Sequence, residues 1–206
     1  MKIAIINYGM GNLASVRRAI EDIGGDCFIA EHPSRLYDAH KIILPGVGSF
    51  SEGMDRLSQH GWVEAIHDSV QNGKTFLGIC LGMQMLATMG EEGGDTNGLN
   101  LIPGRVVRMD KIGCSLRIPH VGWNEVHYKK TAEIFTKIPD GSDFYFVHSF
   151  AFVSESEDHL LATSPYELNV AAVIQKANVM GCQFHPEKSS KAGRQLLRNF
   201  LEFAGC

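Results

Sequence analysis

One cysteine stands where its sulfur could act as a nucleophile. Cys80 lies in the segment Gly78–Gly82, which reads G-x-C-x-G and follows the apolar run Thr75–Ile79. A cysteine between two glycines at the junction of a strand and a helix has the form of a nucleophile elbow, in which a sharp turn lifts one side chain above the sheet. The amides that begin such a helix, that of Leu81 in particular, favour a thiolate and can donate to an oxyanion. We therefore interpret Cys80 as a candidate nucleophile.

A histidine and a glutamate late in the chain could serve this cysteine. His185 and Glu187 lie in the sequence QFHPE, two residues apart, so in extended backbone they project to the same side. Pro186 restrains φ and discourages a helix there. A thiol nucleophile needs a base, and the base needs a group that holds its tautomer. A His-x-Glu pair also occurs in zinc deaminases, but their Pro-Cys-x-x-Cys partner is absent, so no metal site is expected.

Two glycine-rich turns could present backbone amides to a ligand. Residues 44–48 read LPGVG after an apolar run, and such a turn can donate amides to a developing oxyanion, although a plain turn explains it equally well. Residues 8–12 read YGMGN but lack the Lys-Ser/Thr of a phosphate-binding loop. No nucleotide, and no other cofactor, is therefore expected.

The elements that must position these residues alternate, in the first half, between short apolar runs and amphipathic segments, as in βαβ units. Expected strands span 3–6, 27–30, 41–44 and 75–79. Asn12 can cap a helix that follows it, and further helices are expected at 51–58, 62–70 and 81–89.

Beyond residue 90 the runs shorten and become antiparallel in character. Expected strands span 104–109, 122–128, 144–147, 160–163, 170–175 and 179–184, before a closing helix at 190–203. Continuous apolar strands joined by helices imply a sheet covered on both faces. We expect one α/β domain over residues 1–206, with an open, mostly parallel sheet and a partly antiparallel extension.

Composition excludes several classes of protein. The chain has 206 residues, 44% of them hydrophobic and 20% charged, as in ordinary globular proteins. A net charge of −4 argues against nucleic-acid binding, and no apolar run reaches the ~18 residues that a membrane span needs. The N-terminal residues predict a first strand rather than a signal peptide. Five cysteines without a Cys-x-x-Cys pair predict reduced thiols and a cytoplasmic location.

Taken in order, the motifs PGVG, G-x-C-x-G-x-Q and HPE resemble those of the triad-type, class I glutamine amidotransferases, whose fold is flavodoxin-like. Four further blocks are similar to the glutaminase subunits of imidazole glycerol phosphate synthase. These blocks are NYGMGN at 7–12, PHVGWN at 119–124, YFVHS at 145–149 and HPEKSS at 185–190. The resemblance runs from Ile3 to Phe200.

This resemblance implies hydrolysis of L-glutamine to glutamate and ammonia, with the ammonia passing to a cyclase subunit, a (β/α)8 barrel, in a heterodimer. The cyclase would make imidazole glycerol phosphate, on the histidine pathway, and an aminoimidazole carboxamide ribotide. Cys80 would be the nucleophile, His185 the base and later the acid, and Glu187 the orienting carboxylate.

The resemblance also implies roles for residues around the triad. The amides of an oxyanion hole would come from Val47, Gly48 and Leu81. The residues that hold glutamine would be Gly48, Gln84, Glu92 and Ser149. The surface facing the barrel would include Asn12, Trp123, Tyr145 and Lys188, although core packing explains Trp123 equally well.

Other functions remain open at this point. Glutaminase subunits for anthranilate, guanylate or carbamoyl phosphate synthesis share the triad, but the NYGMGN and PHVGWN blocks argue against them. A paralogue that feeds ammonia to a sugar-modifying enzyme of surface polysaccharide synthesis stays possible. A cysteine peptidase or chaperone-like protein would leave Gln84 and the His185–Glu187 pair without a purpose. An intact triad argues against a non-catalytic binding module.

Overall fold

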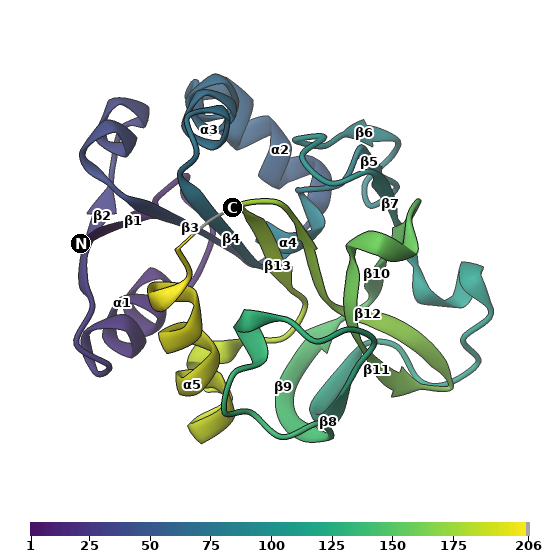
Figure 1. The fold of residues 1–206 in the computed structure, drawn as a ribbon. Coiled ribbons are helices and arrows are strands. Elements are labelled where there is room, and N and C mark those ends of the chain that lie inside the picture. The colour runs from purple at the N-terminus through teal and green to yellow at the C-terminus, as the bar shows by residue number, and fades with distance from the viewer. Residues whose placement is uncertain (205–206) are drawn as a thin grey trace.

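The main sheet has nine strands, and its two halves differ in strand direction (Figure 1). The computed structural model describes residues 1–204. The parallel half contains β1 (Lys2–Ile6), β2 (Asp26–Ala30), β3 (Lys41–Gly46), β4 (Thr75–Cys80) and β13 (Val179–Cys182). The antiparallel half adds β8 (His120–Tyr128), β9 (Ser142–His148), β11 (Leu160–Tyr166) and β12 (Leu168–Lys176).

The strand order is β2-β1-β3-β4-β13-β12-β11-β8-β9. The four pairs from β2 to β13 are parallel, and the four pairs from β13 to β9 are antiparallel. An α/β fold with an antiparallel extension is confirmed. The extension is larger than the sequence predicted, because it contributes as many pairs to this sheet as the parallel half does.

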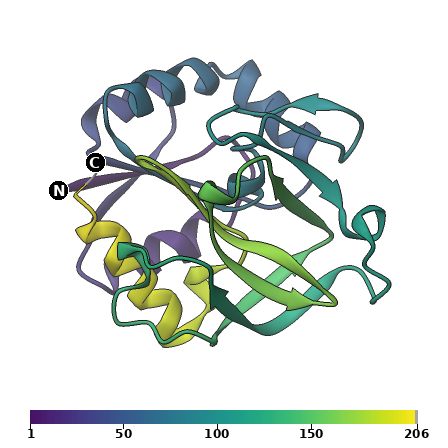
Figure 2. The same ribbon diagram turned by 45° about the vertical axis from the view of Figure 1, so that its right-hand side comes forward.

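Helices cover both faces of the parallel half (Figures 1 and 2). Helices α1 (Leu13–Glu21) and α5 (Ser190–Glu202) cover one face, and α2 (Phe50–Gln59) and α3 (Trp62–Gln71) cover the other. Alternate residues of β1 separate the two cores: Ile5 packs with the first pair of helices and Ile6 with the second. The predicted cap is confirmed, since Asn12 Oδ1 accepts from the Ser15 amide at 3.2 Å.

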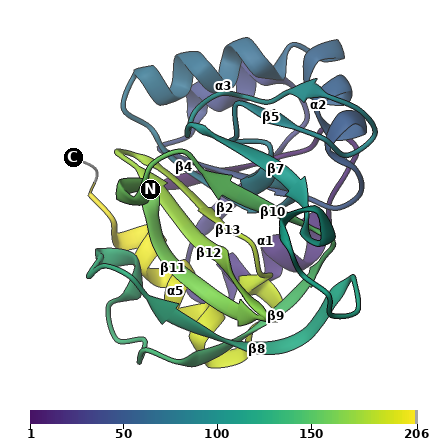
Figure 3. The same cartoon turned by 90° about the vertical axis from the view of Figure 1, so that its right-hand side faces the viewer.

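A second, smaller sheet lies beside the main one (Figure 3). It contains β5 (Met89–Gly90), β6 (Thr96–Asn97), β7 (Gly104–Arg108) and β10 (Phe150–Ser154), in the order β10-β7-β5-β6. Strands β5, β6 and β10 were not predicted. Short 3₁₀ turns complete the chain: η1 (Pro33–Asp38), η2 (Met109–Ile112), η3 (Glu133–Phe135), η4 (Glu157–His159) and η5 (Pro186–Lys188). Among the helices of residues 1–204, none combines the length and the apolar character needed to cross a bilayer.

The predicted helix over 81–89 is wrong beyond its first turn. Helix α4 spans only Leu81–Gln84. The loop 98–102 takes the backbone carbonyls that a longer helix would need: the Leu99 amide, for example, donates to the Met85 carbonyl at 2.8 Å. Tertiary hydrogen bonds thus replace helical ones after the first turn.

The junction between β4 and α4 is sharp because Cys80 itself adopts φ +56° and ψ −110°. The glycines on either side serve close packing instead. A Cβ on Gly82 would lie 1.8 Å from the Leu44 carbonyl oxygen, and one on Gly78 would lie 2.5 Å from the Gly82 carbonyl oxygen. The two glycines therefore let α4 lie directly against β3 and β4.

We predict that Gly82→Ala lowers the free energy of unfolding by about 3 kcal/mol, because the methyl group can fit only if α4 moves away from β3. Chemical denaturation followed by circular dichroism measures this. Gly73→Ala is the matched control: nothing lies within 4 Å of its Cβ position, and its φ is +81°. Only backbone strain of about 1 kcal/mol is then expected. Equal losses from the two changes would contradict the packing argument.

Candidate active site

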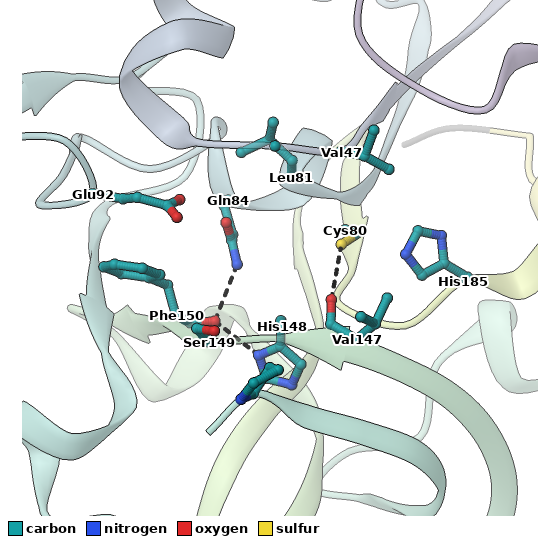
Figure 4. Close-up of a pocket in the computed structure, with 12 residues that line it drawn as sticks. Val47, Cys80, Leu81, Gln84, Glu92, Val147, His148, Ser149, Phe150 and His185 are labelled. Carbon is teal, nitrogen blue, oxygen red and sulfur yellow. Dashed lines mark hydrogen bonds between the residues drawn. The ribbon is translucent and has the colours of Figure 1, made fainter. Parts of the chain in front are cut away.

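A pocket of about 380 Å³ opens at the carboxyl ends of β3 and β4 (Figure 4). This is the edge of an open α/β sheet at which ligands generally bind. Eight residues predicted for the site line it together: Val47, Gly48, Cys80, Leu81, Gln84, Glu92, Ser149 and His185. Four lining residues were not predicted: Pro119, Val147, His148 and Phe150.

The imidazole of His185 lies between a sulfur and a carboxylate. Its Nδ1 is 2.8 Å from Glu187 Oε1, and the two side chains are only 3% and 1% exposed. Its Nε2 is buried without a hydrogen-bond partner in residues 1–204, and the ring faces the Cys80 sulfur (Figure 4). The Nε2 atom is therefore free to exchange a proton with that sulfur.

The charge of His185 follows from these neighbours. Burial lowers the pKa of His185, but Cys80 and Glu187 outweigh burial and raise that pKa to about 9. The imidazole is then protonated near neutral pH, and an imidazolium beside a cysteine favours the thiolate. The arrangement is that of an activated nucleophile.

A serine fixes the turn that carries His185. The Ser189 hydroxyl donates to the His185 carbonyl at 2.6 Å and accepts from the Tyr145 amide at 3.0 Å. The His185 amide donates in turn to the Tyr145 carbonyl at 2.9 Å. Turn η5 is thereby attached to β9, and the imidazole is held relative to the pocket.

The sulfur of Cys80 has two further polar neighbours. Its Sγ lies 3.9 Å from the Val147 carbonyl oxygen and 3.8 Å from Gln183 Nε2. The hydroxyl of Tyr8 is buried without a partner in the described part of the chain, and burial raises the pKa of Tyr8. Gln183 and Tyr8 were not predicted as site residues, although each lies inside a motif noted in the sequence: Gln183 in QFHPE and Tyr8 in NYGMGN.

The PGVG turn begins where β3 ends, beside the nucleophile. Gly46 is the register partner of Cys80. Gly48 has φ +108°, and a Cβ there would lie 2.6 Å from Met10 Cε, so this position requires glycine. Val47 and Gly48 line the pocket with Leu81. The turn and the first residue of α4 therefore border the same space as the sulfur.

The far end of the pocket carries side chains that suit an amino acid. Gln84 Nε2 donates to the Phe150 carbonyl at 3.0 Å. Glu92 Oε2 accepts from the Phe50 amide, at the start of α2, at 3.0 Å. Burial raises the pKa of Glu92, with the Phe50 amide opposing it. Acceptors from Gln84 and Glu92 and the hydroxyl of Ser149 together can bind an ammonium and a carboxylate.

Three of the four predicted surface residues form one cluster. Trp123 is 53% exposed, which excludes core packing within the chain. It pairs in register with Tyr145, and their rings meet edge to face at 6.0 Å. Lys188 Nζ lies 5.9 Å above the Tyr145 ring. The fourth residue, Asn12, is exposed at the start of α1.

Three other cysteines of residues 1–204 do not line the pocket. Cys27, Cys114 and Cys182 are free thiols, like Cys80. Cys206 lies outside the described residues. Within residues 1–204, no group of three His, Cys, Asp or Glu side chains is placed to hold a metal ion.

Curated proteins resemble this chain over nearly its full length. The imidazole glycerol phosphate synthase subunit HisH of Moorella thermoacetica is 45% identical over 200 residues, 97% of this chain and 94% of that protein. The HisH subunit of Bacillus subtilis is 45% identical over 205 residues, 98% and 96% of the two chains.

Solved structures of lower identity share the fold. PurLQS from Thermotoga maritima aligns with a TM-score of 0.75 at 19% identity, over 98% of this chain and 97% of that chain. A glutamine amidotransferase from Thermotoga maritima aligns with a TM-score of 0.66 at 17% identity, over 98% and 83%. The model of the family "Glutamine amidotransferase class-I" matches residues 4–203. The chain therefore belongs to the class I glutamine amidotransferase family.

Proposed function

We propose that this chain, as one amidotransferase domain over residues 1–206, is the glutaminase subunit of an imidazole glycerol phosphate synthase. It hydrolyses L-glutamine to glutamate and ammonia. The observation that carries this proposal is the Cys80–His185–Glu187 arrangement beside a pocket of amino-acid size. Support comes from the family and from relatives, 45% identical, that are named as HisH subunits of that synthase.

In the first half-reaction His185 Nε2 holds the proton of the Cys80 thiol as an imidazolium, and the sulfur, as a thiolate, attacks the carboxamide carbon of glutamine. The carbonyl oxygen becomes an oxyanion, which the amides of Val47 and Leu81 stabilise. His185 then gives its proton to the amide nitrogen. The carbon–nitrogen bond breaks, ammonia leaves, and a thioester remains on the sulfur.

In the second half-reaction water attacks the thioester while His185 takes a proton from that water. The carbon–sulfur bond breaks, glutamate leaves, and the sulfur regains its proton. Glu187 accepts from Nδ1 at 2.8 Å throughout, which holds one tautomer and stabilises the imidazolium.

The substrate is held at the other end of the pocket. The carboxylate of Glu92 and Oε1 of Gln84 accept from the α-ammonium group of glutamine. Ser149 and the backbone of Gly48 bind its α-carboxylate. All four residues line the same pocket as the sulfur, which supports this orientation.

We further propose a cytoplasmic heterodimer with a cyclase barrel that receives the ammonia. Trp123, Tyr145 and Lys188 form its docking surface, with Asn12 at the edge. Exposed Val121 and Val147 are register partners on these strands. They extend the surface to the pocket, because Val147 also lines it. An exposed aromatic and aliphatic surface next to a site that releases ammonia suits a partner that encloses the product.

We predict that Cys80→Ala abolishes glutamine-dependent synthesis of imidazole glycerol phosphate by the complex but leaves synthesis from added ammonium salt. The reason is that this chain supplies only ammonia. Both activities are measured on the same purified complex. Loss of the ammonium-dependent activity from an assembled complex would contradict this division of labour.

We predict that Glu187→Gln reduces activity less than His185→Asn does, because an orienting group contributes less than the base. Glu187 raises the pKa of His185, so the change lowers that pKa from about 9. The imidazolium is then lost at lower pH, and the alkaline limb of the kcat/KM profile for glutamine shifts down. An alkaline limb that stays in place would show that Glu187 does not set the charge of His185.

We predict that the chain alone binds glutamine but turns it over slowly, and that the cyclase and then its ribotide ligand raise kcat. An oxyanion hole with one donor turned away loses about 10²–10³-fold in rate. The Gly46–Gly48 turn is the element that can rotate. Steady-state glutaminase kinetics with and without the partner measure this. Full turnover by the isolated chain would refute the gating while leaving the triad intact.

A further inference from the structure

Behind the pocket, a buried amide to which the proposed reaction gives no role, that of Gln183, links Gln84 to the nucleophile. Gln183 is 0% exposed and Gln84 only 4%. Gln84 Nε2 donates both to the Phe150 carbonyl at 3.0 Å and to Gln183 Oε1 at 3.1 Å. Gln183 Nε2 lies 3.8 Å from Cys80 Sγ. A carbonyl, two amides and the reactive sulfur thus form one connected series (Figure 4 shows its Gln84–Phe150 hydrogen bond).

The Phe150 carbonyl fixes the orientation of both amides. A carbonyl oxygen only accepts, so the group of Gln84 that faces it must be the NH₂ group. The second hydrogen of that NH₂ then meets Gln183, which must present its oxygen. Rotating either amide by 180° would place two donors or two acceptors face to face in a buried site. The loss of these hydrogen bonds would raise the free energy of the folded state. Gln84 Oε1 is left without a donor in residues 1–204 and available to the pocket that Gln84 lines.

The same constraint decides which group of Gln183 faces the nucleophile. Because the Oε1 atom of Gln183 accepts from Gln84, the NH₂ group of Gln183 faces Cys80 Sγ. The other polar neighbour of this sulfur, the Val147 carbonyl, can only accept, so it suits the protonated thiol. The Gln183 amide donates and therefore suits the thiolate. Of these two neighbours, the Val147 carbonyl is the partner of the thiol and the Gln183 amide is the partner of the thiolate.

Two buried histidines hold the Phe150 carbonyl from its other side. His148 Nδ1 lies 2.8 Å from that oxygen, so Nδ1 carries the hydrogen and Nε2 accepts from His120 Nδ1 at 3.0 Å. His120 Nε2 accepts in turn from the Asn124 side chain at 3.2 Å. Burial lowers the pKa of both imidazoles to about 4. Each ring is then neutral, with the single N–H that these contacts require.

We propose that Gln183 is a further residue of the glutaminase reaction with two roles. Its NH₂ group stabilises the Cys80 thiolate. Its Oε1 accepts from the Gln84 amide, which leaves the oxygen of Gln84 free for the substrate. The inference rests on the proposed function. No bond to Gln183 forms or breaks. The thiol proton passes to His185, and the sulfur exchanges the Val147 carbonyl for the Gln183 amide as its partner.

The test compares Gln183→Met, Gln84→Met and a matched control, Gln175→Met, whose amide donates to the nearby Ala177 carbonyl. Two rates are measured. The first is alkylation of Cys80 by iodoacetamide at a fixed neutral pH, followed by mass spectrometry on the chain alone. The second is steady-state glutaminase turnover in complex with the cyclase. Alkylation needs neither glutamine nor partner, so it tests Gln183 even if the chain proves not to be a glutaminase.

Gln183→Met should slow alkylation about tenfold, the effect of losing a hydrogen bond to a charged acceptor, with a matching loss in kcat. It should also raise KM for glutamine about tenfold, because Gln84 is no longer held. Gln84→Met should raise KM, and it should slow alkylation less than Gln183→Met does, because the Gln183 amide remains but loses the donor that orients it. Gln175→Met should change neither. Loosened packing would expose the sulfur and speed alkylation, so the sign separates a chemical role from a structural one.

Gln183→Glu gives an independent measurement if the methionine variant does not fold. The glutamate side chain has the shape of glutamine and keeps an oxygen that accepts from Gln84. It presents a carboxylate oxygen, instead of an NH₂ donor, to the sulfur. Alkylation should again be slow while KM stays near the wild-type value. Alkylation at or above the wild-type rate in either folded Gln183 variant would overturn the role toward Cys80. An unchanged KM in Gln183→Met would overturn the role toward Gln84.

Discussion

The positive φ of Cys80 is the constraint on which the active site depends. A residue with a side chain is strained at φ +56° and ψ −110°, by about 1–3 kcal/mol, and stays only where its surroundings leave no alternative. Here β4 is paired on both sides, by β3 and β13, up to the residues next to the sulfur. On the far side of the turn, α4 lies so close to β3 that Gly82 has no room for a Cβ. Sheet and helix together impose the turn, and the turn lifts the thiol to the edge of the sheet.

The position of the base follows from the strand that neighbours the nucleophile. Strand β13 pairs in parallel with β4 and antiparallel with β12, so it is the strand at which the sheet changes direction. Its carboxyl end lies beside that of β4, and the chain that leaves it contains His185. A histidine 105 residues away in sequence thus lies beside Cys80, because the strands that precede the two residues, β13 and β4, are neighbours in the sheet. The same change of direction separates the parallel half of the sheet from the half that bears Trp123.

The sequence predicted correctly those elements whose formation depends on residues close together in the chain. The apolar runs of β1, β3 and β4 and the cap at Asn12 are visible in the sequence because burial and capping each act over a few residues. Strand β10 and the early end of α4 were not, because both depend on partners far along the chain: β10 pairs with β7, and the loop 98–102 takes the carbonyls of residues 85–87, just beyond α4. The pocket residues were found through motif spacing. Gln183 was missed because a buried, fully bonded amide and a solvated one look alike in sequence.

Strand β9 connects the exposed surface to the chemistry over a few residues. Its Tyr145 belongs to the exposed cluster, and the backbone of the same residue bonds to His185 and Ser189. Two residues on, the Val147 carbonyl faces the sulfur while its side chain is 37% exposed. A protein that binds to this strand and shifts it would therefore move both the His185 imidazole and the Val147 carbonyl, which faces the Cys80 thiol. Because close-packed strands move as units, coupling between a docked partner and the nucleophile needs no longer path than this one strand.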